Sequence, residues 1–351
     1  SLNPVGWTFL GGLPGTAGGR LYGFGVDQVL MLEMVLPNGY HVKFGPTEWE
    51  AAEGYDVPKT LKVSGVCRSN PYEIDEDKWE WEACPEEASI NFDDLWFAVR
   101  GGGGGTWGVV TSIYLQLHEY LPLEITFLQS YICATDEAPQ VIGGFYKTLL
   151  AFLIMFFHDP TSIGVTEAAS NACSGPPGGV IFCFGNDSAM TMFAAWKQFL
   201  IGASPTLISD GMPQSSIDNI LSCSATISPV TDMVEALGFP AGTPYEGQIP
   251  DNPYPNYYTD TISSGNIILP KKWILESIEV IMELETMQQA AGGSLVFDMY
   301  MAFGGRNSQA TSDQANSLSQ AHRDAAFMTF AITHDKLATL NFYSDLLPMM
   351  Y

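Results

Sequence analysis

Apolar and polar residues alternate most regularly close to the start of the chain. The segment VLMLEMVL (29–36) is followed by Pro-Asn-Gly (37–39) and then by YHVKF (40–44). Alternation with a period of two is typical of a β-strand, and Asn-Gly supplies the positive φ angles of a tight turn. The pattern therefore predicts a β-hairpin over residues 29–44.

A second apolar pattern surrounds a run of glycines. The segment DLWFAVR (94–100) predicts a short helix or turn, and five consecutive glycines follow it at residues 101–105. The β-branched residues that come next predict a buried strand within residues 106–118. Residues 46–94 are acidic and have no sustained period, so we expect them to form an irregular excursion on the surface.

Strand-like and helical segments alternate after residue 119, where we place a domain boundary. Strands are predicted over 125–133, 161–169, 178–185, 294–303 and 322–334, and helices over 138–157, 188–202 and 270–289. The apolar patch TLLAFLIMFF (148–157) has about half of the ~20 residues that a membrane-spanning helix needs, so it is predicted to be a buried helix.

The composition excludes two classes of partner. The 351 residues include 39 Asp and Glu against 14 Lys and Arg, which gives a formal charge of −25. Such a surface repels the phosphates of nucleic acids and the headgroups of anionic membranes, and no basic stripe offsets the repulsion. With 46% hydrophobic and 15% charged residues, the chain can nevertheless bury a large core.

The cysteines indicate an oxidising compartment. Six cysteines occur without a metal-type CxxC pair, which favours disulfides over zinc. Cys67 and Cys84 bracket one acidic, Trp-containing segment and are the pair that we expect first. One glycosylation triplet at 186–188 and the lack of a targeting segment after Ser1 agree with a secreted or lumenal protein, whose targeting peptide was removed or lies outside this sequence.

Five glycines in a row need an explanation. Each costs backbone entropy and adds no side chain to a core, so we expect the run to have no packing value. One explanation is a ligand with a phosphate or planar ring that lies directly against the main chain, and the other is a flexible surface loop. Because the run continues into TWGVV (106–110), which should pack, we favour the ligand. No Gly-Lys-Ser/Thr element follows, so a P-loop is disfavoured.

Two segments resemble one family closely. Residues 95–118 (LWFAVRGGGGGTWGVVTSIYLQLH) resemble the signature segment of the FAD-linked oxidases of the berberine-bridge-enzyme type, in the vanillyl-alcohol-oxidase superfamily. Residues 11–36 resemble the glycine-rich stretch of the same family, which is followed by YGxxxDxV and a strand. Residues 294–330 resemble its late substrate-domain strands more loosely, with Arg323-Asp324 at the position of the usual Arg-Asp pair.

The resemblance implies an α+β fold in two parts. Residues 1–118 would form a partial FAD-binding domain of the PCMH type with the acidic insertion 46–94, and residues 119–351 a substrate-binding domain in which helices back an antiparallel sheet. In this family an FAD subdomain precedes the position of Ser1, and a segment that covers the FAD follows that of Tyr351. We therefore expect either an internal piece of a longer or processed polypeptide, with its missing segments or other chains as partners, or a relative that no longer holds flavin alone.

The resemblance also implies FAD as the cofactor and a set of contacts with it. Both glycine-rich segments would touch FAD through backbone groups. Carried over, the contacts would be Gly11, Gly12 and Gly15 near the pyrophosphate or ring, and Gly104, Gly105, Thr106, Gly108, Val109 and Val110 along the rest of the cofactor.

The reaction of this family needs a base beside the flavin. In such enzymes flavin N5 accepts hydride from a carbon that bears a hydroxyl or amine, a base removes the proton, and oxygen reoxidises the flavin. On the predicted strand 294–303, alternation places Asp298 and Tyr300 on the same face, as a candidate proton-accepting pair. The alternative is that this face meets solvent or a helix. The five histidines show no HxH or HxxxH spacing, so we assign no metal site.

Two functions from different classes stay open. The first is an FAD-dependent oxidase, or a processed part of one, that acts on an alcohol, a sugar or a phenolic small molecule with oxygen as the acceptor. The second is a non-catalytic protein with the oxidase fold, a structural or interaction component of a secreted assembly. No GxSxG or comparable nucleophile motif occurs, which disfavours serine-hydrolase chemistry.

Overall fold

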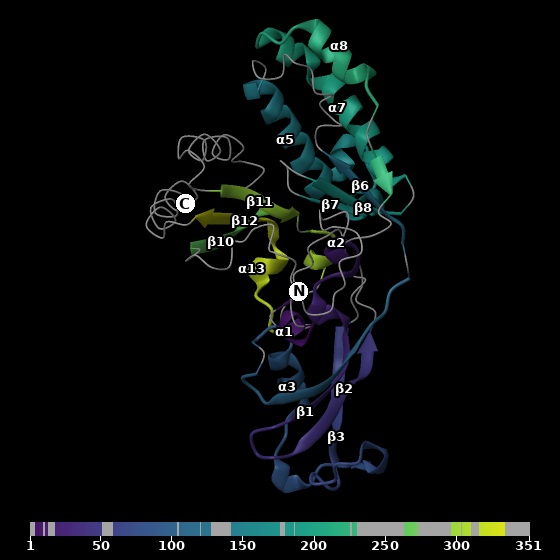
Figure 1. Cartoon of the computed structure of the whole chain (residues 1–351), viewed down its shortest axis with the longest axis vertical. Helices are drawn as coiled ribbons and strands as arrows, with labels where there is room; N and C mark the ends of the chain where they lie inside the picture. The colour runs from purple at the N-terminus through teal and green to yellow at the C-terminus, as the bar shows by residue number, and fades with distance from the viewer. Residues whose placement is uncertain are drawn as a thin grey trace, which may run out of the picture. The chain divides into compact units, whose positions relative to one another are not determined.

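A computed structural model of the chain contains two compact units. Unit 1 consists of Ser1–Tyr120 and Gly304–Asp324, and unit 2 of Leu121–Phe303 and Ala325–Tyr351 (Figure 1). The residues that the structure describes are 4–9, 11–12, 18–50, 59–103, 105–119, 121–127, 142–175, 180–185, 187–224, 227–229, 263–271, 273, 296–302, 304–309 and 316–333. Residues 304–324 belong to unit 1 although they follow the boundary that we drew near residue 119.

Unit 1 is built on an antiparallel sheet with the strand order β4-β3-β2-β1-β5. The strands are β1 (Val29–Val35), β2 (His41–Glu50), β3 (Lys59–Arg68), β4 (Trp81–Glu82) and β5 (Val109–Leu115). The predicted hairpin is confirmed, because Val35 pairs with His41 and Gly39 has a φ of 88° in the turn.

The expectation that residues 46–94 are irregular is wrong in part. They contain the end of β2 and the ten residues of β3, which pairs antiparallel with β2 over most of its length. Val63 and Cys67 of β3 face the core, whereas Leu61 is 50% exposed, so the apolar residues of this strand do not mark its buried face. The other described residues of this range, from 69 onward, contain β4, the short helices η2 (Glu76–Lys78) and η3 (Glu86–Ala88) and the start of α3 (Phe92–Val99).

Helix α3 covers one face of this sheet and closes the core of unit 1. Asn91 caps the helix, since its side chain accepts hydrogen bonds from the backbone N–H groups of Asp93 and Asp94. Trp96 and Val99 on the buried face of α3 belong to one apolar cluster with Leu32, Met34, Val42 and Phe44 of the sheet. Burial of these side chains is the main favourable term in holding unit 1 together.

Strand β5 exists as predicted, but the prediction that it is buried is wrong. Among the described strands it pairs only with β1 and lies at the edge of the sheet. Val109 is 68% exposed and Tyr114 is 38% exposed. A central position would have covered both sides of the strand, whereas an edge position leaves one side open.

A disulfide-closed loop covers part of the other face of the sheet. The predicted Cys67–Cys84 disulfide is confirmed, and it closes residues 68–83 into a loop. Within this loop Arg68 stacks on Trp79, with its guanidinium carbon 3.9 Å from the ring centroid. Arg68 Nη1 lies 3.2 Å from His41 Nδ1, and His41 Nε2 lies 3.1 Å from the Thr111 hydroxyl of β5. Buried His41, itself in β2, thus links Arg68 at the start of the loop to Thr111 in β5.

Short helices from both ends of the sequence complete unit 1. They are α1 (Pro4–Phe9), α2 (Gly18–Tyr22) and η1 (Gly25–Gln28) from the amino-terminal segment, and η6 (Gly305–Ser308) and α13 (Gln320–Arg323) from residues 304–324. His322, which we expected at the end of a strand, lies in α13, because the Ser319 side chain caps a helical turn there.

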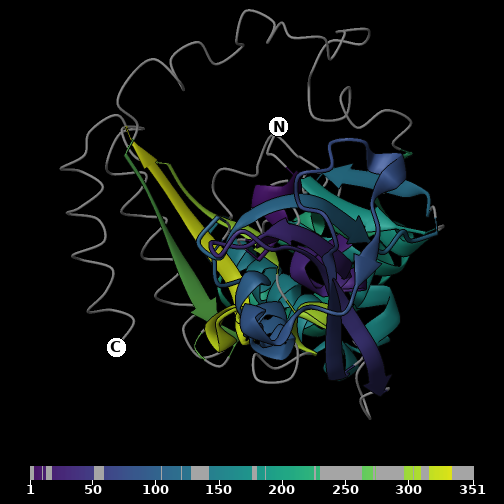
Figure 2. The same ribbon diagram turned by 90° about the horizontal axis from the view of Figure 1, so that it is seen from below.

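Unit 2 contains two further sheets. One has the order β7-β8-β6-β9, with β6 (Leu123–Phe127), β7 (Cys173–Ser174), β8 (Val180–Phe184) and β9 (Ile227–Pro229). The other has the order β10-β12-β11, with β10 (Ser263–Pro270), β11 (Val296–Ala302) and β12 (Ala325–Thr333). Figure 2 shows β10 and β12 side by side, as their antiparallel register requires.

Helices and disulfides support the first of these sheets. The helices are α5 (Ile142–His158), α6 (Glu167–Asn171), α7 (Ser188–Ser209) and α8 (Gln214–Ser222). Phe152 and Trp196, from α5 and α7, are fully buried and share one apolar cluster with Ile181 and Cys183 of β8. Cys173 and Cys183 form a disulfide between β7 and β8, and Cys223 is also disulfide-bonded.

The predictions for unit 2 have mixed outcomes. The helices predicted over 138–157 and 188–202 are confirmed as α5 and α7. The strand predicted over 161–169 is wrong, because Gly164 has a φ of 74° and Thr166 caps a helix by accepting a hydrogen bond from the Ala169 N–H. The helix predicted over 270–289 lies almost wholly outside the described residues. No helix within the described part is long and apolar enough to cross a membrane.

We expect acid to destabilise unit 1 partly through His41. Burial first, and then the charge of Arg68, lower the pKa of His41 below 6.5, against the opposing charge of Glu33. As the pH falls below 6.5, the unfolded chain binds a proton that folded His41 does not, so folding free energy is lost. The loss is a fraction of the ~1.4 kcal/mol per pH unit that one whole proton carries.

The variant His41→Gln tests this expectation. Urea unfolding at about pH 7.5 and about pH 5.5 should show a smaller loss of stability in His41→Gln than in the wild type, because glutamine does not titrate. The many carboxylates act equally in both proteins and therefore cancel in the difference. Equal losses in the two proteins would refute the role of His41.

Candidate functional site

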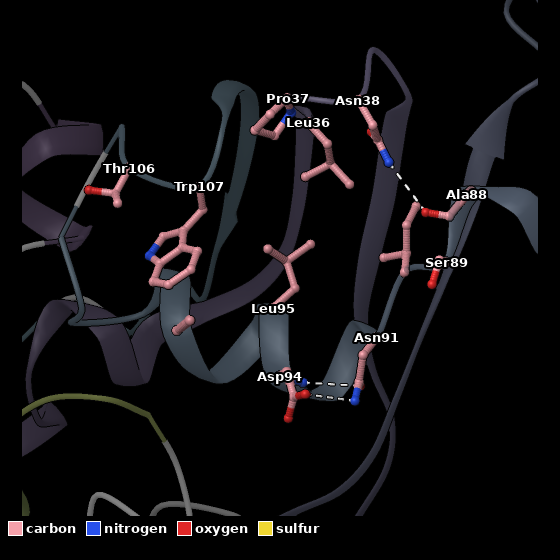
Figure 3. A pocket seen from close by; sticks show the side chains of 12 residues that line it. Leu36, Pro37, Asn38, Ala88, Ser89, Asn91, Asp94, Leu95, Thr106 and Trp107 are labelled. Atoms are coloured by element: carbon pink, nitrogen blue, oxygen red, sulfur yellow. Dashed lines mark hydrogen bonds between the residues drawn. The ribbon is translucent and has the colours of Figure 1, made fainter.

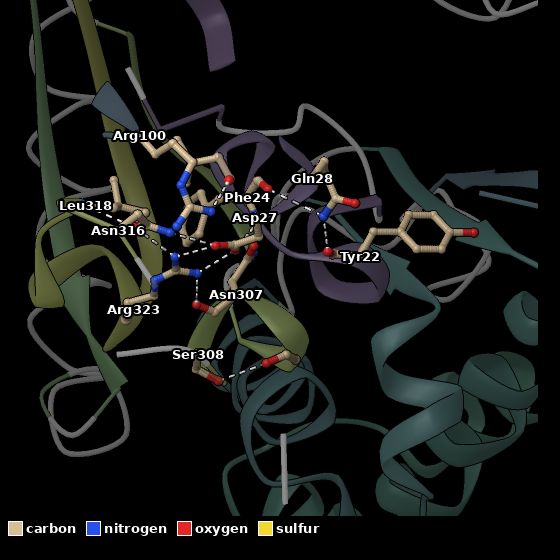
Figure 4. Close-up of polar contacts among 12 residues, drawn as sticks. Tyr22, Phe24, Asp27, Gln28, Arg100, Asn307, Ser308, Asn316, Leu318 and Arg323 are labelled. Carbon is tan, nitrogen blue, oxygen red and sulfur yellow. Dashed lines mark hydrogen bonds and ion pairs between the residues drawn. The ribbon is translucent and has the colours of Figure 1, made fainter. Parts of the chain in front are cut away.

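The three segments that resemble the oxidase family meet in unit 1. Asp27 lies in η1, in the first segment, and Arg323 ends α13, in the third. Arg323 Nη1 donates to Asp27 Oδ2 at 2.7 Å, and Arg323 Nη2 donates to Asp27 Oδ1 at 2.7 Å (Figure 4). The side chains are 0% and 1% exposed, so this two-point ion pair is buried.

Additional hydrogen bonds satisfy the buried carboxylate. Asp27 Oδ2 accepts a hydrogen bond from the Phe24 N–H at 3.0 Å, which closes the turn of η1. Asp27 Oδ1 accepts one from Asn316 Nδ2 at 2.9 Å. Arg323 also donates to the Asn307 carbonyl at 3.1 Å. Hydrogen bonds of this kind offset the lost hydration of a buried ion pair, although Arg323 Nε has no hydrogen-bond partner among the described residues.

Arg100, the residue before the glycine run, brings the second segment to the same network. Its Nη1 donates to the Val26 carbonyl at 3.3 Å, and its guanidinium lies over the Trp96 ring at 4.2 Å. Burial lowers the pKa of Arg100 to about 9, with the charge of Asp27 raising it and that of Arg323 lowering it. The Asp27 carboxylate therefore acts on Arg100 through its charge, whereas it is hydrogen-bonded to Arg323.

The glycine run divides into two parts with different surroundings. A Cβ at Gly101 would lie 2.6 Å from the Leu318 nitrogen, and a Cβ at Gly102 would lie 2.4 Å from the Ala98 carbonyl oxygen. Our expectation that the run has no packing value is therefore wrong at these two positions. At Gly103 the nearest atom would be 3.7 Å away, and at Gly105 none would lie within 4 Å. Only this second part leaves main chain beside open space.

The first glycine-rich segment is packed against the chain itself. A Cβ at Gly11 would lie 2.9 Å from a methyl group of Leu318, and one at Gly12 would lie 2.4 Å from the Gly25 Cα. The Gly12 carbonyl accepts a hydrogen bond from the Gly25 N–H at 2.9 Å. These close approaches account for the two glycines without a ligand, so their contact with a cofactor remains a prediction. Gly15 and Gly104 lie outside the described residues.

A pocket lies beside the end of the glycine run. It has a volume of about 500 Å³ and is formed by the β1–β2 turn, residues 88–91, one side of α3 and the segment after the glycines (Figure 3). The lining residues are Leu36, Pro37, Asn38, Ala88, Ser89, Ile90, Asn91, Asp94, Leu95, Ala98, Thr106 and Trp107. The lining includes one carboxylate, Asp94, and no Lys, Arg or His, so the pocket suits an uncharged or cationic group better than a phosphate.

The remaining predicted contacts lie at the start of β5. A Cβ at Gly108 would lie 2.4 Å from the Val35 carbonyl oxygen, so this glycine allows β5 to approach β1 closely. Val109 and Val110 follow as the first residues of β5, paired with Val35 and Met34. Their contact with a cofactor stays a prediction.

The candidate base pair lies on β11, in unit 2. The strand predicted over 294–303 is confirmed as Val296–Ala302. Asp298 pairs with Phe330 and Tyr300 with Met328 of β12, and no register shift separates the two positions. The side chains of Asp298 and Tyr300 lie outside the described part, so their role as a base remains a prediction.

Sequence reasoning missed the partner of Arg323. We matched Arg323-Asp324 to a family motif, but the Asp324 carboxylate accepts a hydrogen bond from Gln320 at 3.0 Å, and Arg323 pairs with Asp27 instead. The aspartate of YGxxxDxV was a usable signal, since it stands in the motif that carries the resemblance. Asn316 carried no signal. Within the described part of the chain, no group of His, Cys, Asp or Glu could hold a metal ion.

Alanine substitutions at Gly101 and Gly105 form a matched test of the two parts of the run. Both glycines have a positive φ, 108° and 79°, so both substitutions cost about 1–2 kcal/mol from backbone conformation. Gly101→Ala also forces a Cβ into the backbone of Leu318, which adds about 1–3 kcal/mol. We expect the urea-unfolding free energy to fall more in Gly101→Ala, and equal losses would contradict the division of the run.

Comparison with known proteins agrees with this architecture, although no protein-family model matches the chain. The FAD-linked oxidoreductase malF of Malbranchea aurantiaca is 43% identical over 61 residues, which are 17% of this chain and 10% of malF. The VAO-type flavoprotein MtVAO615 of Myceliophthora thermophila C1 has a TM-score of 0.51 and 17% identity, over 98% of this chain and 50% of that one. BBE-like 1 of Physcomitrella patens has a TM-score of 0.50 and 14% identity, over 99% and 59%.

The match to malF covers 10% of that protein. This chain covers 50% of MtVAO615 and 59% of BBE-like 1. The chain thus spans roughly half of those flavoproteins. Over that span its fold is the mixed α+β fold of the VAO-type and berberine-bridge-enzyme-like flavoproteins.

Proposed function

We propose that unit 1 binds FAD and that the chain is part of an FAD-dependent oxidoreductase. One observation carries the proposal: three distant segments that resemble the oxidase family contribute Asp27, Arg100 and Arg323 to one buried network. The network adjoins the glycine run, whose second part offers bare main chain. The name of the relative malF, an FAD-linked oxidoreductase, agrees with this proposal.

The residues present fit a flat dinucleotide. Gly103 and Gly105 would hold it through backbone groups, because a side chain is absent there and open space lies on that side. Thr106 and Trp107 line the adjoining pocket. The indole ring of Trp107 could stack on an uncharged ring of the cofactor there. The carboxylate of Asp94 would repel the pyrophosphate from the same pocket, so the phosphates would lie nearer to the glycines.

The chemistry follows from this assignment. Bound FAD supplies an acceptor for a hydride. The chain would supply the base: we assign Asp298 and Tyr300 on β11 to take the proton from the hydroxyl of the substrate.

The proposed substrate is an alcohol, a sugar or a phenolic small molecule, and the proposed acceptor is oxygen. A hydroxyl-bearing carbon is what a hydride acceptor beside a carboxylate and a phenol can oxidise. The disulfides Cys67–Cys84 and Cys173–Cys183 support a secreted or lumenal location, where such bonds persist.

An FAD titration of the purified chain tests the cofactor. We expect the visible absorption bands of oxidised flavin in the protein as isolated, or saturable quenching of flavin fluorescence when FAD is added. The variant Gly105→Trp, which fills the open space beside the run, should weaken binding about ten-fold or more. A colourless protein that takes up no FAD would overturn the proposal and favour the non-catalytic oxidase fold.

Substitution of the proposed base tests the chemistry. Asp298→Asn and Tyr300→Phe should slow reduction of the flavin by substrate about 10²–10⁴-fold while FAD binding stays within about two-fold of the wild type. Anaerobic stopped-flow absorbance measures the reduction and the titration above measures the binding. Met299→Leu, a conservative change on the same strand, serves as the control. Reduction at the wild-type rate in both variants would remove these residues from the mechanism.

A further inference from the structure

We propose that Asp27 and Arg323 are positioning residues, which fix the backbone of the glycine run although neither side chain belongs to it. The proposal deepens the proposed function, because the run is where we place FAD. It rests on a continuous series of contacts inside unit 1, from the ion pair to the glycines.

The first step leads from the ion pair to the turn at residues 316–318. Asn316 donates from Nδ2 to Asp27 at 2.9 Å, and its Oδ1 accepts from Arg323 Nη2 at 3.3 Å. The same Oδ1 accepts a hydrogen bond from the Leu318 N–H at 3.1 Å. Asn316 is fully buried and therefore has its amide fixed by both members of the ion pair. The conformation of the turn depends on that amide.

The second step leads from this turn to the end of α3. The Ser317 N–H lies within hydrogen-bond distance of two carbonyls, those of Phe97 and Arg100, at 3.2 and 3.0 Å. The Ser317 hydroxyl contacts the carbonyls of Ala98 and Arg100 at 3.1 and 3.2 Å. Carbonyls at the carboxyl end of a helix lack intrahelical partners, so Ser317 supplies the donors that finish α3.

The third step is steric and reaches the glycines themselves. The Cβ directions of Gly101 and Gly102 point at Leu318 and Ser317, at 2.6 and 2.8 Å. These two glycines thus pack directly against the 316–318 turn, and the space between the glycines and the turn cannot hold a side chain. This packing determines the direction in which the chain continues to Gly103 and Gly105.

The Asp27–Arg323 pair with Asn316, called the anchor below, contributes more than stability, because it consists of buried charges. Replacing a buried ion pair by apolar residues of similar volume is often neutral or stabilising, so a pair of this kind adds specificity of geometry more reliably than free energy. Here Asp27 and Arg323 are joined by two hydrogen bonds, and each of them is also hydrogen-bonded to the Asn316 side chain. An apolar substitute could fill the space but could not orient the amide.

The position of Arg323 along the chain extends the consequence. Arg323 is two residues before Ala325, the first residue of β12, which pairs with β11. The segment that carries the anchor therefore leads directly into the sheet that holds Asp298 and Tyr300.

The decisive variant is the double substitution Asp27→Leu/Arg323→Met. It removes both charges of the pair together, so neither is left without its partner. The opposing effects of Asp27 and Arg323 on buried Arg100 are removed at the same time, and Arg100 keeps its hydrogen bond to the Val26 carbonyl. The matched control is Glu33→Leu/Lys43→Met, which removes the 2.8 Å ion pair between neighbouring strands of the same unit without touching the run. Hydrogen exchange of the backbone amides of residues 97–108 is measured without FAD, the urea midpoint reports global stability, and the FAD titration reports cofactor affinity.

The proposal expects a separation of these readouts. In Asp27→Leu/Arg323→Met the urea midpoint should stay close to that of the wild type, while exchange at residues 101–103 becomes about ten-fold faster or more and the Kd for FAD rises about ten-fold. The control Glu33→Leu/Lys43→Met should change neither the exchange at residues 101–103 nor the Kd for FAD. Wild-type exchange in the double variant would overturn the proposal, and so would the same acceleration in the control.

A milder substitution covers the case in which the double variant does not fold. Ser317→Ala removes the hydroxyl that contacts two carbonyls at the end of α3, and it leaves the ion pair intact. Exchange at residues 101–103 should then accelerate about three-fold or more, and unchanged exchange would overturn the proposal. The exchange readout needs no cofactor, so a failure of the wild type to bind FAD would refute the proposed function without affecting this result.

Discussion

The buried ion pair between Asp27 and Arg323 joins the two chain segments from which unit 1 is built. It joins two residues that are 296 positions apart in the sequence, and it does so where neither side chain is exposed. Removing one partner would leave a charge in a low-dielectric interior, which costs about 3–5 kcal/mol. The long connection between β11 and β12 is thereby held within unit 1, although its two strands belong to unit 2.

The glycine run shows how one sequence feature serves two physical purposes. Gly101 and Gly102 are required by the chain itself, because backbone and side-chain atoms of the 316–318 turn and of α3 occupy the place of a Cβ. Gly103 and Gly105 face open space, and self-packing does not explain them. A ligand argument built on the length of the run would therefore count residues that the fold already needs, whereas the argument from the second part stands by itself.

Patterning predicted local structure well where one face of an element is buried and the other is exposed. The hairpin of β1 and β2 and the helices α5 and α7 followed from period and turn residues, and the segment between Cys67 and Cys84 suggested its disulfide. Strand β3 was missed because its apolar residues do not mark its buried face: Leu61 is exposed, whereas Val63 and Cys67 are buried. The segment at residues 161–169 was misassigned because β-branched residues outweighed the helix cap at Thr166.

The sequence by itself determined the segments that resemble flavin-linked oxidases, and through that resemblance the α+β fold class, because such motifs are contiguous in the chain. Only the tertiary structure decided which aspartate meets Arg323, which glycines are free, and that residues 304–324 belong with the first unit. The reason is physical: pairing in a buried network and contact at a missing Cβ depend on distances between residues that are remote in sequence, which neither periodicity nor residue type encodes.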